Sequence, residues 1–133
     1  MLNFLALLFS LLPLDGVHYS AINHGLRHGI DPALVMAVIQ VESSGRQYVR
    51  NGNCVGLMQV DCRIWQLYET KMFRVDYNIE AGVRVLRHYL DMANGDVSKA
   101  LHYYNNGPSG KHNNKKYAPK VMRQYREISR RLH

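Results

Sequence analysis

The sequence predicts a mainly α-helical single domain with little or no sheet. At 133 residues the chain is long enough for one hydrophobic core and too short for two. Hydrophobic residues make up 47% of the chain and charged residues 20%, which is typical of a folded globular protein. Nearly every periodic stretch has apolar residues at helical spacing, and no repeat or low-complexity tract interrupts them.

The N-terminal residues 2–14 are apolar and carry no charge. A helix of that length reaches roughly 20 Å, short of the ~30 Å hydrocarbon core of a bilayer, so a full transmembrane span is disfavoured. We interpret residues 1–16 as a leader, either a secretory signal or a membrane-associating segment, although no Lys or Arg precedes it. A helix that covers the core is the alternative. We expect residues 17–133 to form the functional domain.

Helix start and stop signals divide the rest of the chain. Asp31 followed by Pro32 predicts a helix start, and Gly45 stops that helix after Ser43. Asp76 is expected to cap the longest helix, which ends before Gly95. The expected helices cover residues 17–29, 32–43, 63–70, 76–94, about 97–104 and 118–132, with an irregular loop or small hairpin at 45–56 and a polar loop at 105–115.

The net charge of +7 is concentrated near the C-terminus. Residues 1–98 contain eight Lys or Arg against nine Asp or Glu, whereas residues 99–133 contain nine against Glu127 alone. Such a basic segment favours a polyanionic neighbour, such as cell-wall polymer, anionic lipid or nucleic acid. The alternative is a solvated helix face without a partner.

Two cysteines, Cys54 and Cys62, flank the segment "VGLMQVD". In an exported protein we expect this pair to form a disulfide, whereas in a reducing cytosol both would remain buried thiols. Their spacing matches no common zinc pattern. His24 and His28 stand four residues apart on a helix, but no third ligand is evident, and we expect both to be exposed. We therefore expect neither a metal nor a cofactor.

Glu42 is the acidic residue whose position is hardest to explain by packing alone. It lies on the same helical stripe as Val35, Val38 and Ile39, so it should point toward the interior and not into open water. Apolar surroundings and the negative end of the helix dipole both favour the protonated carboxyl. A carboxyl kept neutral near pH 7 can act as a general acid. The alternative is a partly exposed glutamate at a helix end.

Several motifs in order resemble one known family. The segments are "HGIDPALVMAVIQVESSG", "GLMQ", "DYNIEAGVRVLRHYL" and "KALHYYNNGP". Together they resemble the catalytic domain of soluble lytic transglycosylases, over roughly residues 17–130. That resemblance implies a lysozyme-like fold of the goose-type and transglycosylase kind, and an enzyme that cleaves peptidoglycan.

The resemblance also implies roles for individual residues. Glu42 would be the catalytic acid and base, accompanied by Ser43. One tyrosine hydroxyl of the "YYN" segment would lie near the catalytic carboxyl, and Tyr103 stands where the family's Ala-Tyr-Asn motif has alanine. Met58 would pack on the sugar, and Gln59 would hydrogen-bond it. The implied substrate-binding residues are Ser43, Gly56, Leu57, Met58, Gln59, Tyr103, Tyr104 and Asn105.

The implied reaction is a lytic cleavage by Glu42 alone, which leaves a 1,6-anhydro sugar. A hydrolytic glycosidase usually requires a second carboxylate, and Asp61 is the nearest candidate. The alternative interpretation of Asp61 is an N-cap for the next helix. The rivals are therefore a goose-type hydrolase assisted by Asp61, and a non-enzymatic basic helical protein that binds wall polymer or nucleic acid.

The expected partners and location follow from the resemblance. We expect a monomer that acts on peptidoglycan strands after export to the periplasm or cell envelope. It could serve a secretion, conjugation or pilus complex, or belong to a phage particle or phage lysis system. Nucleic acid is disfavoured as a partner, and membrane contact would involve residues 1–16.

Overall fold

The computed structural model describes residues 16–132 of the chain. Five α-helices and a small three-stranded sheet make up the described part, so the mainly α prediction is confirmed. The predicted leader lies outside the described residues, apart from Gly16. The elements are α2 (Gly16–Arg27), α3 (Pro32–Ser43), β1 (Arg50–Asn51), β2 (Cys54–Val55), β3 (Val60–Asp61), the 3-10 helix η1 (Glu69–Lys71), α4 (Val75–Met92), α5 (Val97–Asn106) and α6 (Tyr117–Leu132).

Helix α3 is the most deeply buried element. Its start is the one predicted, because the Asp31 side chain accepts a hydrogen bond from the Ala33 amide and Pro32 opens the helix. Its end is fixed by Ser44, which adopts a left-handed conformation and donates its amide to the Gln40 carbonyl. Between these ends the side chains from Pro32 to Ile39 are all buried.

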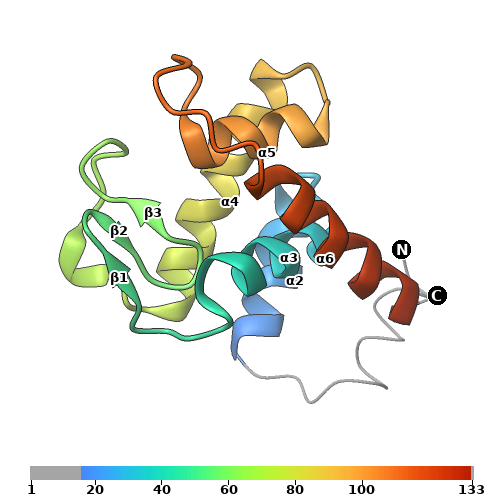
Figure 1. Ribbon diagram of the computed structural model, residues 1–133. Coiled ribbons are helices and arrows are strands. Elements are labelled where there is room, and N and C mark those ends of the chain that lie inside the picture. Colours follow the sequence, from blue (N-terminus) through green and yellow to red (C-terminus); the bar gives the residue numbers. More distant parts are fainter. Residues whose placement is uncertain (1–15, 133) are drawn as a thin grey trace.

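Helices α2, α5 and α6 each pack against α3 or α4 (Figure 1). Helix α6 packs on α3 and α5, and α2 packs on α4 and α3. Antiparallel strands β1, β2 and β3 lie in sequence order, with β3 in contact with α4. The buried apolar residues of all these elements form one hydrophobic cluster. Within residues 16–132, no helix is long and apolar enough to cross a membrane.

The helix predicted at residues 63–70 is wrong. Turns replace it, and only Glu69–Lys71 forms a single 3-10 turn. Gln66 has a left-handed backbone, and the Leu67 amide bonds back to the Cys62 carbonyl, which closes the chain into a loop. Ile64 is 72% exposed, so the apolar residues of this stretch do not form a buried helical stripe.

Two expectations about polar residues also fail. Asp76 does not cap α4, because the helix begins at Val75 and the Asp76 carboxylate accepts hydrogen bonds from Ser20 and His24 on α2. His24, expected to be exposed, is only 3% exposed. Burial beside a carboxylate satisfies its ring, which explains why a polar residue occupies the packed face of α2.

Both cysteines are free in the structure, so the disulfide expected for an exported chain is not formed. Cys54 on β2 is paired across the hairpin with Asp61, not with Cys62. Directly opposed residues share a face of a sheet, whereas neighbours along a strand alternate. Cys62 follows β3 in a turn and is buried, whereas Cys54 is half-buried.

A buried asparagine on α4 holds the segment between β2 and β3. Asn78 is 1% exposed, donates its amide to the carbonyls of Val55 and Met72, and accepts a hydrogen bond from the Met58 amide. A side chain at Gly56 would come within 2.2 Å of the Asn78 amide nitrogen, so only glycine allows this contact. Asn78 thereby fixes residues 56–59 against α4.

We predict that Asn78→Ala lowers the free energy of unfolding by about 2–4 kcal/mol, since it leaves buried main-chain groups without partners. Urea unfolding followed by circular dichroism measures this change. Asn23→Ala, an exposed substitution on α2, is the control and should change stability by less than about 0.5 kcal/mol. An Asn78→Ala variant as stable as this control would show that the loop does not depend on Asn78.

Candidate active site

The Glu42 carboxyl lies at the junction of α3 and α6. Glu42 is in the last turn of α3 and is half-buried. The hydroxyl of Tyr117, at the first position of α6, donates a hydrogen bond of 2.9 Å to Glu42 Oε2. Tyr117 is 5% exposed, so the donor itself is fixed by packing. The prediction that Glu42 points toward the interior agrees with this geometry.

Burial changes the acidity of Glu42. Desolvation raises the pKa of its carboxyl from 4.5 to about 7, and the hydrogen bond from Tyr117 opposes part of that rise. Near neutral pH the protonated and ionised forms therefore coexist. A group in that state can both donate and accept a proton at neutral pH, as general acid and base catalysis requires.

Tyr104 joins α5 to the segment between β2 and β3. Its hydroxyl donates a hydrogen bond of 2.7 Å to the Met58 carbonyl. Burial raises the pKa of Tyr104 well above its ordinary value, and the nearby charge of Glu42 raises it further. The resemblance places a tyrosine hydroxyl of the "YYN" segment near the catalytic carboxyl, and Tyr104 interacts electrostatically with Glu42. The hydroxyl that is hydrogen-bonded to the Glu42 carboxyl belongs to Tyr117.

The other two residues of that segment are Tyr103 and Asn105. Tyr103 is half-buried, and its ring lies 6.1 Å from the ring of Tyr89. Asn105 is exposed near the end of α5. The buried residue is the next one, Asn106, which exchanges two hydrogen bonds with the main chain of Asn114 and closes the loop before α6.

The side chains of residues 57–59 point into the protein. Leu57 is 1% exposed and Met58 is fully buried, with its side chain against Gly82 of α4. Gln59 donates to the carbonyls of Val49 and Gly56 and is 9% exposed. The expectation that the Met58 side chain packs on a sugar therefore does not fit this structure. These side chains hold the loop in place.

Ser43 likewise has a structural position. Its side chain is buried, donates to the Ile39 carbonyl and accepts a hydrogen bond from the Gly45 amide. These bonds satisfy main-chain groups at the end of α3, next to Glu42. Ser43 thus stabilises the helix end on which Glu42 stands.

Asp61, for which a helix N-cap was one of two interpretations, makes capping contacts with a turn. Its Oδ1 accepts hydrogen bonds of 3.0 Å from the amides of Arg63 and Ile64. The turn that follows is not the helix expected there. The carboxylate is therefore used to order the turn after β3.

Comparison with protein families decides the classification. The model of the transglycosylase SLT domain matches residues 20–126. The chain belongs to this family. Glu42, the segment at residues 56–59, Tyr104 and Tyr117 all lie inside the matched region of the SLT domain.

One relative and one solved structure are similar to this chain. The SLT chain is 35% identical over 102 residues to a transglycosylase of Enterobacteria phage PRD1. The matched region covers 73% of this chain and 38% of the relative. Its fold resembles that of lytic transglycosylase Slt from Pseudomonas aeruginosa, solved as an inactive glutamate-to-glutamine variant. That match has a TM-score of 0.62 and 18% identity, and covers 86% of this chain and 22% of the other. This chain thus spans well under half the length of either protein.

Tyr117 is the site residue that the sequence analysis missed. The sequence predicts that the last helix begins at residue 118, and the resemblance points to the tyrosines at 103 and 104. A signal was present, because the apolar stripe of this SLT helix at Val121, Tyr125 and Ile128 extends back by four residues to Tyr117. That register places its ring on the buried side of α6.

We predict that Glu42→Gln stabilises the protein in a pH-dependent way. Because the pKa of Glu42 is raised from 4.5 to about 7 on folding, the folded state binds its proton more tightly than the unfolded state. Wild-type stability should therefore fall as pH rises through this interval. Above about pH 7 the loss of wild-type stability no longer grows but remains. The advantage of the variant should grow by about 3 kcal/mol between pH 4.5 and pH 8.

Urea unfolding across this pH range measures the difference between the two proteins. Glu127→Gln on α6 is the matched control, and its difference from wild type should stay nearly constant. A Glu42→Gln advantage that does not change with pH would contradict the raised pKa.

Proposed function

We propose that this SLT chain is a peptidoglycan lytic transglycosylase that uses Glu42 as its sole acid and base. It would cleave the β-1,4 bond between N-acetylmuramic acid and N-acetylglucosamine and leave 1,6-anhydro-N-acetylmuramic acid ends. The observation that carries the proposal is the Glu42 carboxyl, half-buried at the end of α3 with a pKa of about 7. Family membership and the transglycosylase of phage PRD1 support it.

In the first step, protonated Glu42 would donate its proton to the bridging oxygen of the glycan. Tyr117 donates to Glu42 Oε2, so the acidic proton is best placed on Oε1, which can be directed at the substrate. The bond between C1 of the muramic acid sugar and the bridging oxygen then breaks. The carboxylate that remains is stabilised by the Tyr117 hydroxyl and by the positive charge that develops at C1.

In the second step, the same carboxylate would remove the proton from the 6-hydroxyl of the muramic acid sugar. The 6-oxygen then bonds to C1 and closes the anhydro ring, and Glu42 is protonated again. No water is consumed, and one group performs both proton transfers. A pKa near neutrality suits this double use, since neither protonation state is strongly disfavoured at neutral pH.

The contacts of Asp61 favour this mechanism over hydrolysis. A hydrolase of the goose-type kind would need a second carboxylate to activate water. Asp61 Oδ1 already accepts two amides of the turn that follows β3. We therefore assign Asp61 to loop structure.

The substrate would be held mainly by residues of the "YYN" segment whose side chains are accessible. Tyr103 is half-buried and Asn105 is exposed, so both can contact a sugar. Gly56, Leu57, Met58 and Gln59 would contribute by fixing the loop beside Glu42, not through their own side chains.

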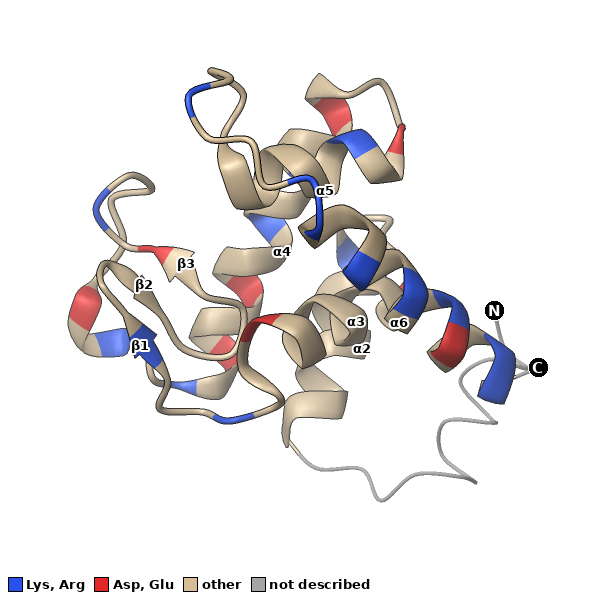
Figure 2. Ribbon diagram, in the orientation of Figure 1, with Lys and Arg blue, Asp and Glu red and all other residues tan. Residues whose placement is uncertain are grey.

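The setting would be extracytoplasmic, because peptidoglycan lies outside the cytoplasmic membrane. The similarity to a transglycosylase of phage PRD1 favours a phage over an envelope-spanning secretion or pilus complex. Helix α6 presents exposed cations along one side, which favours contact with anionic wall polymer or lipid (Figure 2). These cations are Lys120, Arg123, Arg126, Arg130 and Arg131.

We predict that the chain releases anhydro-muropeptides from purified peptidoglycan and that Glu42→Gln lowers the rate by about 100-fold or more. Mass spectrometry distinguishes the products, because an anhydro end is lighter by one water than a reducing end. Asp61→Asn is the matched variant and should keep most of the activity.

Products with only reducing ends, together with loss of activity in Asp61→Asn, would instead establish the hydrolase. Binding to peptidoglycan without any release of fragments, unchanged in Glu42→Gln, would establish the non-enzymatic rival.

A further inference from the structure

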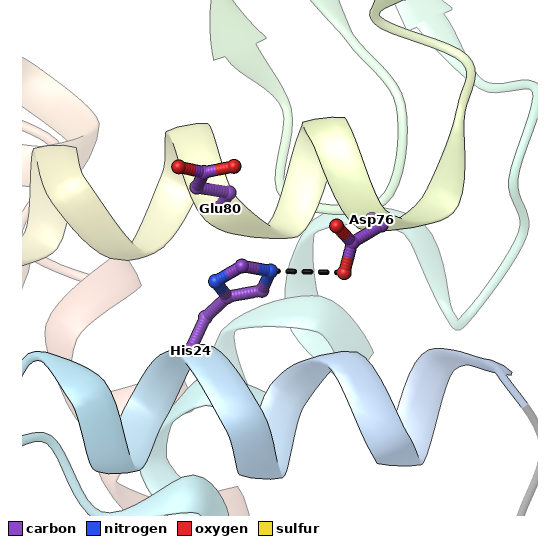
Figure 3. Close-up of side chains that lie close together, drawn as sticks. All are labelled: His24, Asp76 and Glu80. Carbon is purple, nitrogen blue, oxygen red and sulfur yellow. Dashed lines mark hydrogen bonds and ion pairs between the residues drawn. The ribbon is translucent and has the colours of Figure 1, made fainter.

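A histidine and two carboxylates lie close together between α2 and α4 (Figure 3). His24 comes from α2, and Asp76 and Glu80 come from α4. One potential ligand atom from each residue lies within 4.8 Å of the other two. His24 Nε2 and Asp76 Oδ1 are 2.9 Å apart. This cluster is formed by residues other than those of the Glu42 site.

The backbone presents these groups in a suitable arrangement for a metal ion. Asp76 and Glu80 are four residues apart on one face of α4, and His24 reaches toward them from the neighbouring helix. Tetrahedral zinc with bonds of 2.0–2.1 Å places its ligand atoms roughly 3.4 Å apart. The potential ligand atoms of His24, Asp76 and Glu80 would reach this spacing if the two carboxylates rotated about their side-chain bonds.

A neighbouring hydroxyl orients the Asp76 carboxylate. The Ser20 hydroxyl donates a hydrogen bond of 2.6 Å to Asp76 Oδ1. This bond from Ser20 is an outer hydrogen bond of the kind that orients the first ligands of many metal sites. His24 Nε2 would give up its bond to Asp76, and any proton on that nitrogen, when it coordinates the ion.

One side of the cluster is open to solvent. The His24 side chain is 4% exposed, whereas the Asp76 side chain is 72% exposed. An ion could thus enter over the carboxylates and meet the buried ring behind them. Arg84 is a competitor, because it pairs with Glu80 Oε1 at 3.2 Å and must give up this contact. That pair is partly exposed and therefore weak.

We propose that His24, Asp76 and Glu80 bind a divalent transition metal ion of the zinc class. One imidazole and two carboxylates match the ligands of Zn²⁺, and water would complete the coordination. Magnesium and calcium prefer oxygen ligands alone, so they fit this donor set less well. The two carboxylates neutralise the charge of the ion.

The ion would link α2 to the first two turns of α4. Asn78 lies between Asp76 and Glu80 in sequence, and residues two positions away point to the opposite side of a helix. The metal would therefore stabilise the turns whose other face holds residues 55–58 through Asn78. Metal binding should strengthen the packing that supports the loop beside Glu42.

The test is Zn²⁺ binding to the full chain after treatment with a chelator. Calorimetry should show one Zn²⁺ bound per chain with micromolar affinity, and Zn²⁺ should raise the melting temperature by several degrees. Magnesium at the same concentration should cause no shift. Glu80→Gln, which is nearly isosteric and leaves the His24 and Asp76 pair intact, should weaken Zn²⁺ binding at least about tenfold.

Two control variants separate this site from other zinc ligands. Glu127→Gln removes a carboxylate that pairs with Arg130 on α6, much as Glu80 pairs with Arg84, and should bind Zn²⁺ like the wild type. Cys54→Ser tests binding by the free thiols. The proposal is overturned if Zn²⁺ does not bind, if Glu80→Gln and Glu127→Gln bind it equally, or if only Cys54→Ser abolishes binding.

Discussion

The removal of water from the Glu42 carboxyl is the constraint on which the functional interpretation depends. Helix α3 is buried along most of its length, and α6 closes over its end with Tyr117. A carboxyl in such a place costs less free energy when it is protonated, so the packing that forms the core also raises its pKa to about 7. Stability and the proposed acid catalysis therefore make opposite demands on Glu42, because the burial that suits a general acid is unfavourable to the ionised carboxylate.

The loop of residues 56–59 shows how a sequence motif can act through geometry. Its side chains are buried, its main chain is bound by Asn78, and its Met58 carbonyl accepts the Tyr104 hydroxyl. Gly56 is required where Asn78 approaches, and Gly82 where Met58 packs. The residues of the motif "GLMQ" thus hold this loop between α4 and α5, and this packing explains their residue types.

The helices were largely predictable because local signals and packing agree in them. Asp31 and Pro32 define the start of α3, and the apolar stripe of α4 matches its buried face. The stretch after Cys62 was not predictable, because its turn is closed by contacts with Asp61 and by a left-handed Gln66. Glu42 could be identified from its stripe, but its bond to Tyr117 spans 75 positions and depends on how α6 packs. The partnership of His24 with Asp76 is likewise a contact between helices.

The most direct test of the central claim is the titration of the Glu42 carboxyl itself. Carbon-13 NMR of glutamate-labelled protein can follow this group, and Glu42→Gln assigns its signal. The account predicts a pKa of about 7 and a further rise in Tyr117→Phe, since that change removes the hydrogen bond that lowers it. A pKa near the ordinary value of 4.5, unchanged in Tyr117→Phe, would contradict the account.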